Sequence, residues 1–274
     1  MLNPSRADRL AGLLEFSIRS LPHPYARIFL RRIILRHPVR AMLGIRRYWL
    51  QSVTDIQEYR LSDSGEDVFV PRAACAAEHL LVATGFCQKP VPVAGKHDGC
   101  PAGRFNHDCL FLTALELGPP AERFASRACE DCFVRVLGHA ALRAGASFAI
   151  LTSALDVAEQ ILIPALELRR FTHVLMALCP YSLEPMSFAL QVCCMDGYVF
   201  AFDTGACSDY REWLLADRGD KREQTGLSAT GIRRLFNLLN SVAEASSQSG
   251  PSRPTVFESI DHVLRPVPGR TAPF

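Results

Sequence analysis

Residues 145–156, Gly-Ala-Ser-Phe-Ala-Ile-Leu-Thr-Ser-Ala-Leu-Asp, decide the fold class of this chain. The apolar run 147–151 predicts a buried strand, and Ser153 with Asp156 three positions later predicts the capped start of a helix that continues to about Arg169. A second strand is expected at 173–178, a helix at 185–194, a turn at Asp196-Gly197 and a third strand at 198–202. Strands that alternate with helices of this length predict an α/β fold, with a small, mainly parallel sheet flanked by helices.

The segments around this core are less regular. A helix over 131–144, closed by Gly145, is predicted before the first strand, and another helix is expected at about 73–84. Between them, residues 85–127 are rich in Pro and Gly and form a Cys-rich irregular insertion, which calls for a function or a bound ion to organise it. Further helices are expected at 210–216 and 228–245, followed by an extended and partly disordered tail.

The N-terminal part of the chain reads as helical. Apolar spacing predicts a helix over 5–20, and two more helices are expected before Leu61. The polar stretch 62–67 is typical of a linker. We therefore expect an Arg-rich helical region at 1–61, a Cys-rich α/β metal-binding domain at 68–245 and a Pro/Ser-rich tail at 246–274.

The composition argues against membrane-spanning, secreted and disulfide-stabilised proteins. No apolar run reaches the length of a membrane span and the N-terminus lacks the pattern of a signal peptide, so a cytoplasmic protein is expected. Ten cysteines among 274 residues are too few for a disulfide scaffold. In a reducing compartment such thiols are buried, bind metal or carry redox chemistry.

The positive charge is concentrated at the N-terminus. Residues 1–60 hold eleven Arg and four acidic residues, a net charge of +7, against +2 for the whole chain. Residues 26–50 contain seven Arg and no acidic residue, interleaved with apolar residues. This segment is either a helical hairpin, broken at His37-Pro38, that packs its apolar side on the protein, or a peripheral contact with a membrane or a partner protein. No nucleic-acid-binding motif accompanies the charge, so no specific nucleic acid is expected.

Five cysteines fall within 46 residues of the irregular region. Cys129 and Cys132 have the two-residue spacing that lets two thiolates reach one metal, at the start of a helix. With Cys100 and Cys109 they form a predicted four-cysteine set for an iron–sulfur cluster or Zn²⁺. Whether Cys87, Cys179 or Cys207 completes the site stays open. A redox dithiol and inert buried thiols are the alternatives.

Topology suggests a competing set. Cys179 follows the second predicted strand and Cys207 follows the third, so both are expected at the carboxyl edge of the sheet, where α/β proteins bind ligands. The same reasoning brings Cys129 and Cys132 to that edge. Three polar residues near these cysteines are candidates for outer contacts to the site: His97, His107 and Asp203. The remaining cysteines are interpreted as core thiols: Cys75, Cys193 and Cys194.

Three functions fit these patterns. The first is an iron–sulfur protein with an electron-transfer role and a redox partner. The second is a zinc-stabilised binding or scaffold module. The third is a metal-dependent enzyme of unknown substrate, with Asp203 or Asp217 as its acid/base group. Phosphate-binding, dinucleotide-binding and serine-hydrolase motifs are absent from the sequence.

Residues from about 129 to 221 resemble a known family. The CxxC pair opening a helix, the Gly before a strand at 145–151 and the strand ending in Cys179-Pro180 are similar to the cysteine-rich prokaryotic proteins of domain of unknown function 116. The resemblance implies a metal-binding or iron–sulfur role, with Cys129, Cys132 and Cys179 at metal-site positions. It covers about a third of the chain and supplies no reaction.

Overall fold

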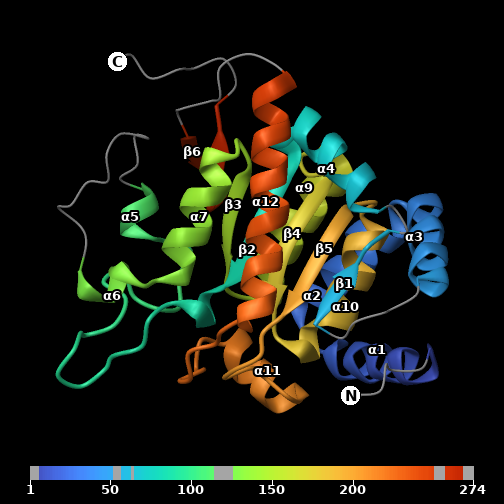
Figure 1. Ribbon diagram of the computed structural model, residues 1–274. Coiled ribbons are helices and arrows are strands. Elements are labelled where there is room, and N and C mark those ends of the chain that lie inside the picture. The colour runs from blue at the N-terminus through green and yellow to red at the C-terminus, as the bar shows by residue number, and fades with distance from the viewer. Residues whose placement is uncertain (1–5, 52–56, 63–64, 114–125, 250–256, 268–274) are drawn as a thin grey trace.

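A computed structural model describes residues 6–51, 57–62, 65–113, 126–249 and 257–267. Its centre is a seven-stranded sheet with the strand order β1-β5-β4-β2-β3-β7-β6 (Figure 1). The strands are β1 (Glu58–Arg60), β2 (Leu80–Gly85), β3 (Ser147–Leu151), β4 (His173–Leu178), β5 (Asp196–Ala201), β6 (Phe257–Ile260) and β7 (Val263–Pro266). Strands β2 to β5 run parallel, and β1, β6 and β7 add antiparallel edges. The predicted α/β class with a mainly parallel sheet is confirmed.

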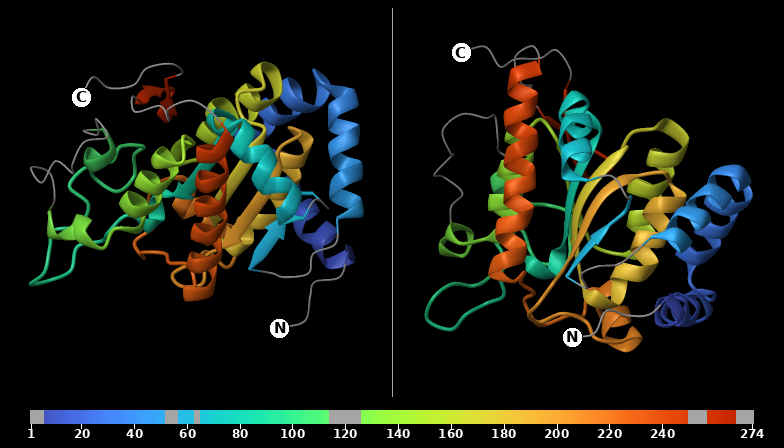
Figure 2. Two further views of the ribbon diagram at one scale, coloured as in Figure 1. Left: turned by 45° about the horizontal axis from the view of Figure 1, so that its top comes forward. Right: turned by 45° about the vertical axis from the view of Figure 1, so that its right-hand side comes forward.

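Helices cover both faces of the sheet, as Figures 1 and 2 show. One face carries α4 (Glu66–Cys75), α7 (Phe133–Arg143) and α12 (Ala229–Ser249). The other face carries α3 (Pro38–Leu50), α10 (Pro180–Val192) and the continuous helical segment of α8 (Ala154–Val157), η5 (Ala158–Leu162) and α9 (Ile163–Leu168). Side chains alternate between these layers: Leu80 and Val82 pack on the first side, and Leu81 and Ala83 on the second.

Shorter elements surround the layers. At the N-terminus, α1 (Arg6–Ser20), α2 (Pro24–Ile28) and the π-helical turn η1 (Phe29–Leu35) precede α3. The remaining elements are η2 (Ala77–His79), η3 (Phe86–Gln88), α5 (Leu110–Thr113), α6 (Arg127–Glu130) and α11 (Tyr210–Asp217).

The predicted helix over 73–84 is wrong in its second half. Helix α4 ends at Cys75, and residues 80–85 form β2, the strand at the centre of the parallel sheet. The helix-forming run Ala-Ala-Cys-Ala-Ala leads into this strand with no Gly or Pro between them. The sequence therefore contains no residue that signals the end of the helix. The strand lies between two parallel neighbours and is buried at every position, which overrides its local preference.

The tail prediction is also corrected. Helix α12 continues to Ser249, and β6 and β7 form a hairpin whose second strand pairs with β3. Asp261 and His262 form its turn with φ of 50° and 62°, a conformation that suits two-residue hairpins. Smaller boundary differences occur in the core: α10 begins at Pro180, and β5 begins at Asp196, so Asp196-Gly197 belongs to the strand.

The N-terminal helices pack on the sheet's second helical layer. Helix α3 presents Ala41, Gly44 and Tyr48 to the protein, and a Cβ on Gly44 would come within 2.3 Å of the Val192 Cα on α10. This close approach explains the small residues on the inner side of α3. Within the described ranges, no helix combines the length and the apolar character that crossing a lipid bilayer requires.

Candidate functional site

Four cysteines from two separate segments of the chain line one small cavity. Cys100 and Cys109 come from the loop after β2, while Cys129 lies in α6 and Cys132 directly precedes α7. Cys129 and Cys132 are buried, and Cys100 and Cys109 are partly buried. The structure therefore brings together the four-cysteine set that the sequence suggested.

The start of α7 positions the CxxC pair. The backbone N–H of Cys132 donates to the carbonyl of Cys129 at 3.3 Å, which closes a tight turn, and Cys132 is the N-cap of the eleven-residue helix. Burial raises the pKa of the Cys132 thiol to about 11, and the nearby backbone N–H groups of Arg135 and Val134 act against that rise. Burial likewise raises the pKa of Cys109, opposed by backbone N–H groups of Leu112 and Phe111. Amide groups that face sulfur stabilise its thiolate, the form that binds metal.

A buried lysine holds the loop of this site in place. Lys89 is 1% exposed, and its ammonium group donates to the carbonyls of Asp108 at 2.7 Å, Asn106 at 2.9 Å and Gly103 at 3.2 Å, and to the Asn106 side chain. Burial lowers the pKa of Lys89, while Cys100 and Cys109 act to raise it. The ammonium group thus organises the loop and places a positive charge beside the thiols.

A second cluster lies at the carboxyl edge of the parallel sheet. Cys87 follows β2, Cys179 follows β4 and Cys207 follows β5, and these three strands are neighbours in the order β5-β4-β2. Cys179 is hydrogen-bonded to both of the other thiols. The sequence predicted Cys179 and Cys207 at this edge, but it placed Cys129 and Cys132 beside them, whereas the structure places that pair with Cys100 and Cys109.

Two of the three thiols accept hydrogen bonds from neighbouring side chains, and one of these donors is a second buried lysine. Lys221 Nζ donates to Cys207 Sγ at 3.1 Å, and Thr225 Oγ1 donates to Cys87 Sγ at 3.2 Å. The hydrogen bond from Cys179 is the main reason that the pKa of Cys87 is lowered. Hydrogen bonding to Cys179, followed by burial, raises the pKa of Cys207. The surroundings thus favour ionisation of Cys87 over that of Cys207, and the charge of Lys221, which contacts Cys207, also acts to lower the pKa of Cys87.

Hydrogen bonds of Arg104 connect the loop of the four-cysteine cavity to the segments beside the three-thiol cluster. Its guanidinium donates to the carbonyl of Cys87 at 3.2 Å and to the carbonyls of Lys221 and Glu223. The loop that carries Cys100 is thereby tied to both segments that flank the three-thiol cluster.

The other predicted site residues lie away from the sulfurs or make different contacts. His107 Nδ1 is hydrogen-bonded to the carbonyl oxygen of Ile150 at 2.9 Å, and its Nε2 to Thr152 Oγ1 at 3.1 Å. Both ring nitrogens therefore have partners at the end of β3. His97 Nδ1 accepts from the backbone N–H of Gly99 within its own loop. Asp203 is exposed.

The interpretation of three cysteines as core thiols is correct only for Cys193, which is buried. Cys75, at the last turn of α4, and Cys194, just after α10, are exposed. Cys194 has a φ of 61°, in the left-handed region. It follows the end of the helix, where the chain turns back toward β5.

Sequence reasoning missed both lysines. The chain contains only three lysines against twenty-seven arginines, and two of the three are buried beside cysteines. That scarcity, together with the position of Lys89 two residues after Cys87, is the signal that could have found them. The position of Cys87 at the edge of the sheet does not follow from the sequence, because the sequence predicts a helix where β2 lies.

Among the described residues, no three His, Cys, Asp or Glu side chains are already arranged to hold a metal ion. Comparison with protein-family models, curated proteins and solved structures finds no match.

Proposed function

We propose that Cys100, Cys109, Cys129 and Cys132 bind a metal centre, with an iron–sulfur cluster as the first assignment and an electron-transfer or other redox role. The observation that carries the proposal is the convergence of these four cysteines, from two separate segments, on one cavity. Metal binding would complete the site by drawing the sulfurs together. A structural Zn²⁺ is the alternative assignment.

Two features around the four cysteines support an iron–sulfur cluster as the bound metal centre. Thiolate-ligated iron–sulfur centres carry negative charge, and hydrogen bonds to sulfur and nearby charges tune their reduction potentials. Here the buried ammonium group of Lys89 lies close enough to Cys100, Cys109 and Cys132 to interact with their charges. Backbone N–H groups face the sulfurs of Cys109 and Cys132.

Anaerobic purification followed by an absorption spectrum and elemental analysis tests this assignment. We expect a brown protein with several iron atoms and matching acid-labile sulfide per chain. Colourless protein with about one zinc ion per chain would replace the cluster with the structural alternative. Protein that binds neither metal, even after anaerobic reconstitution, would refute metal binding by this chain.

We also propose that the N-terminal helices contact an anionic membrane surface. Opposite its buried stripe, α3 exposes an apolar stripe of Val39, Met42, Leu43, Trp49 and Leu50, with exposures between 49% and 70%. A solvated helix normally turns polar residues outward, whereas α3 packs Ala41, Gly44 and Tyr48 on the protein and leaves this second apolar stripe exposed.

The positive charge around this stripe favours contact with an anionic membrane surface over contact with an uncharged one. Six of the seven Arg in 26–50 are exposed, and Arg46 lies within the stripe itself. Arg32 and Arg36 both pair with Glu167, at 3.2 and 3.3 Å, but the segment retains an excess of positive charge. Exposed apolar side chains among Arg residues are typical of helices that lie in the interface of anionic membranes.

Vesicle binding tests the membrane contact. The Trp213→Phe protein keeps Trp49 as its single tryptophan, and its emission is expected to shift to the blue with phosphatidylglycerol vesicles but not with phosphatidylcholine vesicles. Met42→Glu is expected to abolish the shift, and Arg46→Gln to weaken binding about fivefold, since each Arg contributes about 1 kcal/mol. Val136→Glu, at an exposed site on α7, serves as the matched control. Equal vesicle binding by Met42→Glu and the control would show that the exposed stripe of α3 is not the membrane contact.

A further inference from the structure

An apolar pocket of about 290 Å³ lies outside the carboxyl ends of the parallel strands. Residues that follow β2, β3, β4 and β5 form one side of its wall, and residues of α1, α2, η1, α8, η5, α10 and α11 form the rest. Among the four parallel strands, the first in sequence, β2, lies between β3 and β4, so the chain changes direction between β2 and β4. Ligands of open α/β sheets bind at this switch point. Cys87 and Cys179, which follow these two strands, both line the pocket.

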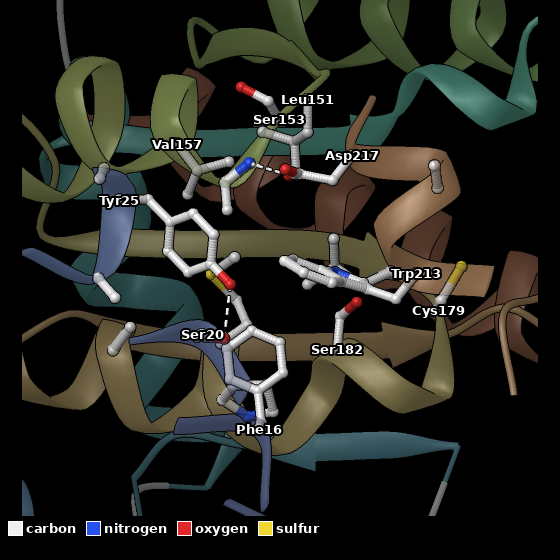
Figure 3. A pocket seen from close by; sticks show the side chains of 18 of the residues that line it. Phe16, Ser20, Tyr25, Leu151, Ser153, Val157, Cys179, Ser182, Trp213 and Asp217 are labelled. Carbon is white, nitrogen blue, oxygen red and sulfur yellow. Dashed lines mark hydrogen bonds between the residues drawn. The ribbon is translucent and has the colours of Figure 1, made fainter. Parts of the chain in front are cut away.

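Aromatic side chains close the pocket on the helical side. Figure 3 shows Phe16, Tyr25 and Trp213 around the cavity, and the rings of Phe16 and Tyr25 meet Trp213 edge-on with centroids 4.9 and 5.8 Å away. Leu21 and Leu30, which are 62% and 47% exposed, also belong to the wall and mark where it reaches the surface. The walls therefore offer hydrocarbon and aromatic surface both inside and at the rim.

Two of the polar side chains of the wall, Tyr25 and Asp217, are held by hydrogen bonds to other residues of the wall. The Tyr25 hydroxyl donates to Ser20 Oγ, and Asp217 accepts from the backbone N–H of Ala154 at 2.6 Å. Asp217 is the only ionisable carboxyl or basic side chain in the described wall, and burial raises its pKa. A wall with this single acid and no cation selects against an anionic ligand and leaves apolar contact as the main source of affinity.

We propose that this pocket binds an uncharged, predominantly hydrocarbon small molecule, with the thiols of Cys87, Cys179 and Cys207 contacting its inner end. For scale, an engineered apolar cavity of about 150 Å³ binds benzene, so a ligand on the order of ten carbon atoms fits here. This site is separate from the four-cysteine cavity, and the inference does not depend on the metal proposal. The hydrocarbon could be supplied by a free small molecule or by a membrane lipid chain.

Trp213 provides a direct reporter of binding. Because the chain has two tryptophans, Trp49→Phe leaves Trp213 in the pocket wall as the single emitter. Titration of this protein with 1-decanol is expected to change the Trp213 emission and reach saturation. Decanoate is expected to bind at least tenfold more weakly. No saturable change with 1-decanol, or equal affinity for decanoate, would overturn the proposal.

Two substitutions on α11 locate the binding. Ala216 lines the pocket one helical turn after Trp213, so Ala216→Phe in the Trp49→Phe background is expected to fill it and raise the dissociation constant for 1-decanol at least tenfold. Leu215 is 43% exposed and lies outside the wall, and Leu215→Phe is expected to leave the constant unchanged. Unchanged binding by Ala216→Phe would place the 1-decanol elsewhere and contradict the assignment.

A second arm separates the two sources of hydrocarbon. If phosphatidylglycerol vesicles change Trp213 emission and Ala216→Phe abolishes the change, the occupant is a lipid chain. A response to 1-decanol alone identifies a free molecule as the occupant. Metal content is measured on the same preparations: protein that holds metal but does not bind 1-decanol refutes only this inference, and metal-free protein that binds 1-decanol refutes only the metal proposal.

Discussion

Replacing Cys132 by serine is expected to remove almost all of the metal that we propose the wild-type protein binds. Cys132 combines a buried thiol with a position at the start of α7 that fixes its direction. Loss of an outer hydrogen-bond partner typically costs 10–100-fold in metal affinity, so loss of one of four ligands should cost more than about 100-fold. Elemental analysis of anaerobically purified protein measures the effect. Cys129→Ser is expected to behave in the same way.

Two controls sharpen this prediction. Cys75→Ser changes an exposed cysteine at the end of α4 and is expected to leave the metal content at the wild-type level. Cys207→Ala removes a thiol of the second cluster and is also expected to retain the metal. If Cys207→Ala loses metal while Cys132→Ser keeps it, the metal site lies at the carboxyl edge of the sheet instead.

Replacing Lys89 by methionine is expected to destabilise the chain by about 3 kcal/mol, because removal of one partner from a buried charged network costs roughly 3–5 kcal/mol. Methionine has a similar length but no donor, so the carbonyls of Gly103, Asn106 and Asp108 would lose their shared ammonium group. Buried acceptors without donors are costly, and the loop that carries Cys100 and Cys109 would lose its anchor. Urea denaturation of wild type and variant measures the difference.

Lys96→Met supplies the matched comparison, since Lys96 is exposed in the same loop. Its free energy of unfolding is expected to stay within about 0.5 kcal/mol of the wild type, as is usual for surface changes. Equal stability of the Lys89 and Lys96 variants would mean that the buried ammonium group does not organise the loop.

The parallel core of the fold could be predicted because its signals are local. Strand β3 is an apolar run between Gly145, whose φ is 78°, and the cap residue Ser153, whose hydroxyl accepts from the Asp156 backbone N–H at 3.2 Å. Strand β4 is likewise a buried run between polar boundaries. In both cases local preference and tertiary environment agree, and the sequence shows the element directly.

The missed parts depend on partners that are distant in sequence. Strand β2 is a strand because β3 and β4 flank it, and the hairpin of β6 and β7 is held by pairing with β3. Recognition of β2 would have placed Cys87 at the same edge as Cys179 and Cys207. The separation of the cysteines into two clusters, and the lysine beside each, follow from tertiary packing that spacing does not encode.

In our proposal, one metal centre is ligated by the four cysteines around the Lys89 loop. X-ray absorption at the metal edge of the anaerobically purified wild-type protein tests it most directly, because it counts the atoms bound to the metal. We expect sulfur as the neighbour of every metal atom, with the signal lost in Cys132→Ser and retained in Cys207→Ala. A first shell of nitrogen and oxygen alone, or a sulfur shell that survives in Cys132→Ser, would contradict the claim.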